Sequence, residues 1–386
     1  MYQQFYQRYL DAHQGKQHFA CHSHYFWPDV TRQAMLDYWD DSARYADEKW
    51  SFFFDTVVPQ NQQFISQTLN TGLPEQIVFA PNTHELVARL LSCLNFSKTV
   101  NVLTTDSEFH SASRQLTRLE ETGQLACTRV QTQPFASFTE RFIAQIKQQK
   151  WDMILFSQVF FNSGWVVEDI HKIVQAVEHT DTLIVIDGYH GFMALPTDLN
   201  AIAQRVFYLA GAYKYAQAGE GACFAHVPPG NGLRPVYTGW FAEFGELAKS
   251  RADEVTYACN GMQFAGATMD FCALYRLRAV FNLFAEQNLC VTTINRYIKQ
   301  LQQRFLQLLD AHNHPHLNRE SLLIDDENQR GHFLTFELND EDTTKATSQA
   351  LREKGILTDY RGRRLRFGFG LYHSIDTMTL DELKQV

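Results

Sequence analysis

The chain has 386 residues, of which 45% are hydrophobic and 20% charged, and it carries a formal net charge of −9. This length and composition exclude a disordered or fibrous protein and favour a large core divided between two domains. Acidic and basic residues are interspersed and no apolar run reaches membrane length, so neither a nucleic-acid surface nor a membrane segment is expected.

The N-terminal segment, residues 1–28, predicts an arm followed by a loop rich in histidines and aromatic residues. It lacks the basic and apolar pattern of a secretion signal, and the seven cysteines of the chain are scattered without a CxxC pair. Both features favour a cytoplasmic protein. His18, His22 and His24 could bind a metal, but no further ligand clusters beside them, so we predict no metal site.

The order of the predicted elements indicates an α/β protein. Residues 31–70 are expected to be helical with a break near Pro59. Apolar runs bounded by polar residues or glycine predict strands at 76–80, 99–103, 151–156, 183–186, 206–210 and 222–226. Helices alternate with these strands, which is typical of a mostly parallel sheet. Helices from 268, at 292–312 and at 343–354, with short strands that include 322–324, predict a small α+β layer at the C-terminus.

We therefore expect three parts: an arm and loop at 1–28, a large domain at 29–267 and a small domain at 268–386. The strand at 76–80 leads into Asn82, Thr83, His84 and Glu85 at the start of an amphipathic helix. Free backbone N–H groups and a hydroxyl at a helix start can bind a phosphate. The same residues could instead form only a capping box between Asn82 and Glu85.

A carboxylate and a lysine follow two successive predicted strands. Asp187 ends the run 183–186, with His190 three residues later, and Lys214 comes soon after the run 206–210. This pair suits pyridoxal 5′-phosphate (PLP), because the lysine can form an imine with the cofactor aldehyde while the carboxylate keeps the pyridine nitrogen protonated. Each residue alone could be a surface lysine or a turn-capping aspartate.

Three ordered motifs resemble those of a known enzyme family. Asp-Gly-Tyr-His at 187–190, Tyr-Lys-Tyr at 213–215 followed by Gly-Glu-Gly, and Leu-Arg-Phe-Gly at 365–368 resemble kynureninase and, more broadly, class V aminotransferase-like enzymes of PLP fold type I. The resemblance spans residues 20–380. It implies a large domain with a mostly parallel sheet flanked by helices, a smaller α+β C-terminal domain and PLP as the cofactor.

The resemblance also implies cofactor-binding residues. Thr83, the His84 backbone and Tyr213 match residues that bind the phosphate. Phe109 matches a ring that stacks on the pyridine, and Ser111 matches a neighbouring serine, although His110 departs from the family pattern. Phe109 could instead be a core residue. His190 is expected to contact the cofactor ring or phosphate, or simply to be a satisfied histidine at a strand end.

Two further segments match places where family members reach the phosphate of a neighbouring subunit. Trp240 lies in a Gly-Trp-Phe segment, and Thr268 follows a turn that bears Thr or Asn in the family. They imply a homodimer with shared active sites. Trp240 could alternatively be an interface aromatic that does not touch the cofactor.

The predicted substrate-binding residues are Arg366 and three residues of the N-terminal loop. Arg366 matches the family arginine that binds the α-carboxylate of an amino acid in bidentate fashion. His22, Ser23 and His24 occupy the place of a substrate-contacting loop but replace its usual Asn-Ser-Leu-Gly sequence. The substrate and the individual roles of these histidines therefore remain open.

These residues predict a PLP-dependent enzyme that acts on an amino acid, with Lys214 as acid and base at Cα. Transamination and cleavage at Cβ both remain open, as does kynureninase-type hydrolysis that releases alanine. Cysteine desulfuration is less favoured, because relatives that carry a persulfide use a C-terminal cysteine and none follows Cys290. A PLP-binding regulator, an inactive scaffold or a cofactor-free structural protein are the alternatives outside catalysis.

Overall fold

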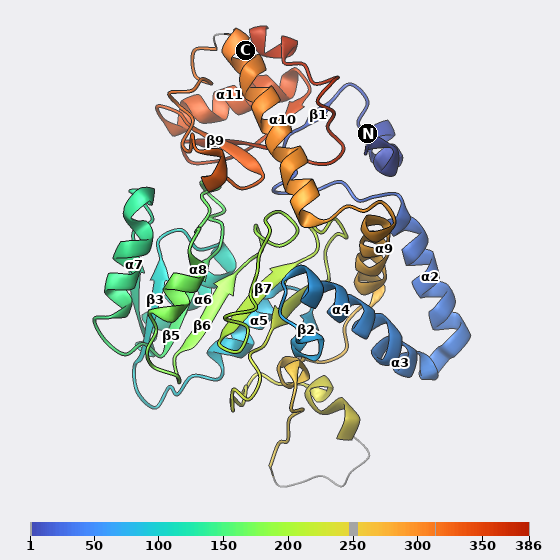
Figure 1. Cartoon of the computed structure of the whole chain (residues 1–386), viewed down its shortest axis with the longest axis vertical. Coiled ribbons are helices and arrows are strands. Elements are labelled where there is room, and N and C mark those ends of the chain that lie inside the picture. Colours follow the sequence, from blue (N-terminus) through green and yellow to red (C-terminus); the bar gives the residue numbers. More distant parts are fainter. Residues whose placement is uncertain (1, 247–253, 313, 386) are drawn as a thin grey trace.

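Seven strands form the central sheet, in the order β2-β8-β7-β6-β5-β3-β4 (Figure 1). The computed structural model describes residues 2–246, 254–312 and 314–385. The strands are β2 (Ile77–Ala80), β3 (Val100–Thr105), β4 (Leu125–Val130), β5 (Met153–Ser157), β6 (Leu183–Asp187), β7 (Val206–Gly211) and β8 (Cys223–His226). Only β8 runs antiparallel to its neighbours β2 and β7. The expected mostly parallel sheet of PLP fold type I is thus confirmed.

The middle strands of this sheet are covered on both faces. Every residue of β5 and β7, and all of β6 before Asp187, is buried, which explains their continuous apolar runs. Asp187 pairs in register with Ser157 on β5 and with Leu209 on β7. Lys214 follows the end of β7 by three residues. The two residues therefore lie at the same edge of the sheet, where α/β proteins bind ligands.

Helices pack around the sheet (Figure 1). They are α2 (Val30–Tyr45), α3 (Lys49–Phe52), α4 (Val58–Thr68), α5 (Thr83–Leu91), α6 (His110–Glu121), α7 (Phe138–Ile146), α8 (Ile170–Gln175) and α9 (Cys272–Glu286). The break predicted near Val58–Pro59 falls where a π-helical turn ends at Val57 and α4 begins at Val58, with Pro59 in its first turn, where a missing N–H is tolerated. The chain bends at Ala46 and at this π-helical turn, Phe53–Val57. Among the described helices, none could cross a membrane.

A second layer lies beyond the central sheet and holds the C-terminal residues (Figure 1). Its antiparallel sheet has the order β11-β12-β9 and is joined by α10 and α11. These elements are β9 (Phe333–Glu337), β11 (Asp359–Arg361), β12 (Arg364–Gly368), α10 (Val291–His312) and α11 (Glu341–Glu353). In place of the strand predicted at 322–324 there is an isolated bridge between Leu322 and Phe336, flanked by two backbone hydrogen bonds to β9. The expected domain boundaries stay a prediction.

The N-terminal arm packs against the turn that follows Lys214. The arm contains η1 (Gln3–Tyr6), α1 (Gln7–Ala12) and the short strand β1 (Gln17–His18), which pairs with β10 (Ile356–Leu357). The Tyr6 hydroxyl donates to Gln217 Oε1. Gly219 has φ +71° and lies against Trp27, so close that a Cβ there would be 2.2 Å from the indole ring. Arm and lysine turn therefore form one packed unit.

Candidate active site

A cavity of about 200 Å³ opens at the edge of the central sheet where Asp187 and Lys214 meet. Eight residues singled out in the sequence line it: Thr83, His84, Phe109, Ser111, Asp187, His190, Tyr213 and Lys214. They come from four separate segments of the chain, which only the folding of the sheet brings together. The cavity combines aromatic walls with a few convergent polar groups, as small-molecule sites do.

Lys214 is buried, and its amine has no carboxylate in hydrogen-bond contact within the described part of the chain. Its Nζ lies 2.5 Å from His190 Nε2 and within 6 Å of the ring centroids of Phe109, Tyr189 and Tyr213. Burial lowers the pKa of Lys214 to about 7, although Asp187 acts in the opposite direction. Near neutral pH a large fraction of this amine is therefore uncharged and able to act as a nucleophile or base.

His190 and Asp187 complete the polar floor of the cavity. Burial, followed by the charge of Lys214, holds the pKa of His190 well below its usual range, so its imidazole is neutral. Its Nδ1 is buried and, within the described residues, lacks a hydrogen-bond partner. Burial raises the pKa of Asp187, while the Tyr189 N–H donates to Asp187 Oδ1 at 2.9 Å and favours the charged form.

Glu108 is a buried carboxyl beneath this floor that the sequence analysis did not identify. Thr105 Oγ1 and Ser157 Oγ each donate to it at 2.6 Å. Burial nevertheless raises the pKa of Glu108 to about 7, and the nearby charge of Asp187 adds to that shift. Ser157 lines the cavity, so Glu108 fixes the orientation of a hydroxyl beside Asp187. No pattern in Asp-Ser-Glu-Phe-His-Ser at 106–111 distinguishes this glutamate from a solvated one.

The start of α5 forms another wall of the cavity. Asn82 Oδ1 accepts a hydrogen bond from the Glu85 N–H at 2.9 Å, so the capping interaction is present. Thr83 and His84, in the first turn of the same helix, line the cavity. The cap and an anion-binding role are thus compatible, because the Asn82 side chain satisfies the third N–H and leaves the first turn directed at the cavity.

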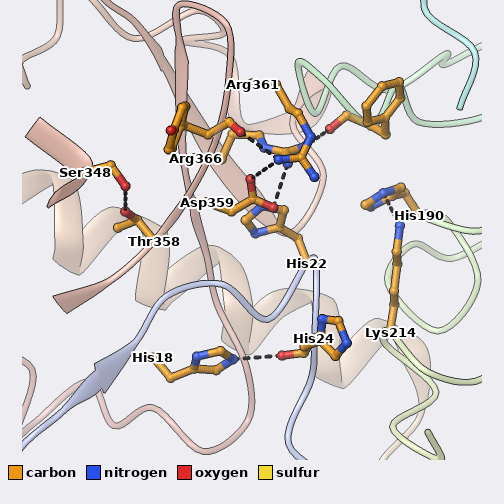
Figure 2. Close-up of polar contacts among 12 residues, drawn as sticks. His18, His22, His24, His190, Lys214, Ser348, Thr358, Asp359, Arg361 and Arg366 are labelled. Atoms are coloured by element: carbon orange, nitrogen blue, oxygen red, sulfur yellow. Dashed lines mark hydrogen bonds and ion pairs between the residues drawn. The ribbon is translucent and has the colours of Figure 1, made fainter. Parts of the chain in front are cut away.

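Arg366 lies on β12 and is buried, but it is not among the residues that line the cavity (Figure 2). Its Nη2 is 2.8 Å from Asp359 Oδ2, and its Nη1 donates to the carbonyl of Phe161. Phe161 lines the cavity, and the charge of Arg366 contributes to the lowered pKa of both Lys214 and His190. The predicted carboxylate-binding arginine is therefore near the lysine, but it already contacts a carboxylate of its own chain.

The three residues of the N-terminal loop lie differently from one another. His22 is buried, and its ring stacks on Phe333 with 4.7 Å between centroids. Ser23 is half-buried. His24 is exposed, and its Nε2 lies 3.6 Å from Glu220, a residue that lines the cavity. Their assigned contacts with a substrate stay predictions.

Trp240 and Thr268 are not part of this cavity lining. Trp240 begins η6 (Trp240–Glu246), which lies at the end of the molecule away from the C-terminal sheet (Figure 1). Its Nε1 is 3.3 Å from Thr268 Oγ1, so the two segments that were predicted to reach a neighbouring subunit do contact each other. Their approach to a second copy of the chain stays a prediction.

The donor set of the cavity fits PLP. A largely neutral lysine amine can bind the aldehyde, and the Asp187 carboxylate at the adjacent strand end can face the pyridine nitrogen. The first turn of α5, with the Thr83 hydroxyl, can bind the phosphate. The buried, unpartnered Nδ1 of His190 marks a polar contact that the protein itself does not satisfy.

Comparison with known proteins agrees with this geometry. The model of the family aminotransferase class V matches residues 30–364. A complex of the cystine C–S lyase C-DES with its product cysteine persulfide is 18% identical, with a TM-score of 0.79, and covers 97% of each chain. A mutant of C-DES with glycine covalently linked to the PLP cofactor is also 18% identical, with a TM-score of 0.80 over 99% of this chain and 96% of that one.

A cysteine desulfurase from Thermococcus onnurineus NA1 is 14% identical, with a TM-score of 0.75 over 96% of this chain and 92% of its own. No curated protein sequence matches the chain. At these identities the solved structures show the shared fold alone. None of the three is described as a kynureninase, so that finer resemblance stays a prediction.

Proposed function

The chain belongs to the class V aminotransferase family of PLP-dependent enzymes, and we propose that it is a lyase that cleaves the Cβ–S bond of a small sulfur amino acid such as L-cystine. One observation carries the proposal: Asp187 and the largely neutral Lys214 line a single cavity, and Arg366 donates to the carbonyl of Phe161, which lines the same cavity. The overall reaction would convert L-cystine and water into cysteine persulfide, pyruvate and ammonia.

PLP, when bound, supplies an electron sink that acidifies the Cα proton of an amino acid and allows the group on Cβ to leave. Arg366 binds the α-carboxylate and fixes which Cα bond faces the ring. Lys214 Nζ takes the proton from Cα, since burial leaves the amine largely uncharged at neutral pH. His190, whose Nε2 contacts Nζ, orients the amine. The sulfur departs with the electron pair of the Cβ–S bond and receives a proton.

Release of sulfur within the product, rather than its transfer to an enzyme cysteine, follows from the thiol in the cavity. Among the residues that line the cavity, the one cysteine is Cys223. Burial raises the pKa of Cys223 to about 11, and its Sγ lies 3.5 Å from the Tyr189 hydroxyl. A protonated, buried thiol is a poor sulfur acceptor. The C–S lyase C-DES, whose described product is cysteine persulfide, is therefore a better parallel than a desulfurase that carries a persulfide.

The size of the cavity favours a small substrate. A volume of about 200 Å³ is below the range of roughly 300–1,000 Å³ usual for drug-sized ligands. PLP itself would fill much of it. We rank kynureninase-type hydrolysis second, because two of the three similar structures are of the cystine C–S lyase C-DES and none of the three is described as a kynureninase.

Product analysis tests the proposal. Holoprotein is incubated separately with L-cystine, L-cysteine, L-kynurenine and L-alanine, and pyruvate, ammonia, sulfane sulfur and alanine are measured. We expect pyruvate, ammonia and sulfane sulfur in equal amounts from L-cystine. Alanine released from kynurenine would instead identify the hydrolase. With a 2-oxo acid added as amino-group acceptor, pyruvate formed from L-alanine without release of ammonia would identify a transaminase. A protein whose spectrum no amino acid changes would be a regulator or scaffold.

A further inference from the structure

The C-terminal sheet carries a polar row that crosses all three of its strands. Asp359 on β11, Arg366 on β12 and Thr335 on β9 are register partners. Side chains of register partners point to the same face of a sheet, so backbone pairing alone places the carboxylate beside the guanidinium. Figure 2 shows Asp359 between Arg366 and His22, on the side of the sheet nearest Lys214.

This row leaves one nitrogen of the Arg366 guanidinium, Nε, without a hydrogen-bond partner among the described residues. Asp359 Oδ2 contacts Nη2 at 2.8 Å and the Phe161 carbonyl accepts from Nη1, whereas Nε is buried and unpartnered within the described residues. Thr335 Oγ1 and both ring nitrogens of His22 are also buried, and they too have no hydrogen-bond partner among the described residues. Buried unpaired polar atoms are rare in native proteins. Several gathered around one guanidinium indicate a polar ligand group.

His22 does not neutralise Asp359. Its Nε2 is 3.8 Å from Asp359 Oδ2, which is too far for a hydrogen bond. Burial and the charge of Arg366 hold the pKa of His22 well below its usual range, so the ring is neutral. Arg361 also contacts Asp359, at 3.2 Å, but its side chain is about half exposed. Arg366 is therefore the buried charge that Asp359 pairs with.

We propose that Asp359 is a positioning residue for Arg366, which holds the guanidinium plane so that Nε points to the carboxylate of the amino-acid substrate. This inference rests on the proposed function. The hydrogen-bond geometry of Asp359 orients the arginine, whereas its negative charge competes with the incoming carboxylate. The two contributions oppose each other and can be separated by substitution.

Two substitutions separate them. Asp359→Asn keeps an acceptor oxygen at the same place and removes the charge. Asp359→Glu keeps the charge and moves the acceptor outward by one methylene. Both retain an acceptor for the buried arginine, and because Asp359→Asn removes its counter-ion, the Tm of each variant is measured first to confirm that it is folded. Glu337→Gln is the matched control, because Glu337 pairs with Arg363 and Arg364 at the solvent-exposed end of the same sheet.

Binding of glycine to the holoprotein, followed by the change in the cofactor spectrum, is the first measurement. We expect Asp359→Glu to raise the Kd for glycine roughly tenfold, because small misplacement of a binding group costs orders of magnitude in productive binding. Asp359→Asn should bind as tightly as the wild type or more tightly. Glu337→Gln should match the wild type. Unchanged binding in Asp359→Glu, or a loss in Asp359→Asn as large as the expected tenfold, would overturn the positioning role.

A second measurement does not need the cofactor. Acetate presents a carboxylate to Arg366 in the apoprotein, and its binding is followed by the rise in Tm at constant ionic strength. We expect the rise to be smaller in Asp359→Glu than in the wild type and at least as large in Asp359→Asn. If L-cystine yields no pyruvate, the proposed function fails, and the acetate titration still decides the role of Asp359. An equal rise in all variants would refute that role.

Discussion

The two sides of the cavity hold buried cations in opposite ways. On the side of the central sheet, Lys214 contacts a neutral histidine and aromatic rings, and burial lowers its pKa to about 7. On the side of the C-terminal sheet, Arg366 is equally buried but keeps its charge, because a guanidinium does not lose its proton in proteins, and Asp359 compensates it. Burial thus makes a reactive amine on one side and requires a counter-ion on the other.

Lys214→Ala removes the reactive amine on the central-sheet side of the cavity. Among the substitutions, it should have the largest effect on activity. Without the amine, kcat should fall by roughly 10³-fold or more, because general acid–base catalysis alone contributes about 10²–10⁴-fold and the covalent hold on PLP is lost as well. Pyruvate release from L-cystine measures this. Lys299→Met is the matched control, since Lys299 also has a pKa lowered by burial, to about 8, but donates to backbone carbonyls on the C-terminal side. Equal losses in both variants would contradict the assignment.

Arg366→Lys replaces the guanidinium that Asp359 pairs with on the C-terminal-sheet side. It keeps a positive charge but loses the planar fork, so we expect KM for the amino acid to rise roughly 10- to 100-fold with a smaller change in kcat, in keeping with about 1.5–3 kcal/mol for a hydrogen bond to a charged group. Steady-state kinetics separate the two parameters. Arg364→Lys serves as control, because Arg364 lies on the same strand and pairs with the solvent-accessible Glu337. A fall in kcat with KM unchanged would argue against carboxylate binding.

Glu108→Gln removes the buried carboxyl near Asp187 and tests whether it makes the stability of the protein depend on pH. The pKa of Glu108 is raised to about 7 in the folded protein, so the folded state holds a proton that the unfolded chain loses near pH 4.5. The free energy of unfolding should therefore be highest below that pH and decrease as pH rises to about 7, by roughly 1–3 kcal/mol.

Urea unfolding of the apoprotein at pH 5 and pH 8 measures this difference, which Glu108→Gln should reduce. The exposed Glu121, paired with Arg118 on α6, provides the control substitution Glu121→Gln, which should leave the pH dependence intact. An equal pH dependence in wild type and Glu108→Gln would show that Glu108 is not the group that titrates.

The pH dependence of cofactor uptake tests the lowered pKa of Lys214 without any substitution. Because only the neutral amine attacks an aldehyde, the rate of PLP uptake by the apoprotein should rise about tenfold per pH unit below the Lys214 pKa and level off above it. The expected midpoint is about 7. A midpoint close to 10, as for an exposed lysine, would remove the proposed effect of burial.

The pair Asp187 and Lys214 could be predicted from the sequence. Of the pair Arg366 and Asp359, only Arg366 was predicted. Asp187 and Lys214 follow apolar runs, and parallel strands bring such ends together whatever the details of packing. Arg366 was identified by its motif, but its partner Asp359 was missed. The two-residue turn Gly362–Arg363, with Gly362 at φ +54°, pairs Asp359 with Arg366, so the hairpin pattern could have revealed the pair.

Other features could not be predicted, because they depend on packing between segments that are far apart in the sequence. The burial of Glu108 arises where β3 and β5 come together, and nothing within its own segment indicates it. The run Leu322–Ile324 has the apolar character of a strand, yet it makes only an isolated bridge and a few backbone hydrogen bonds to β9. The shift of Lys214 to a pKa of about 7 likewise needs burial against residues such as Phe109, which come from distant parts of the chain.

The central claim is that the amine of Lys214 holds PLP in the cavity beside Asp187. Reduction of the PLP-loaded protein with borohydride fixes the cofactor to the amine that carries it, and mass spectrometry of the digested protein locates that amine. We predict a single pyridoxyl phosphate label, on Lys214. A label on Lys299 or another lysine, or no label in a protein that has taken up PLP, would contradict the account.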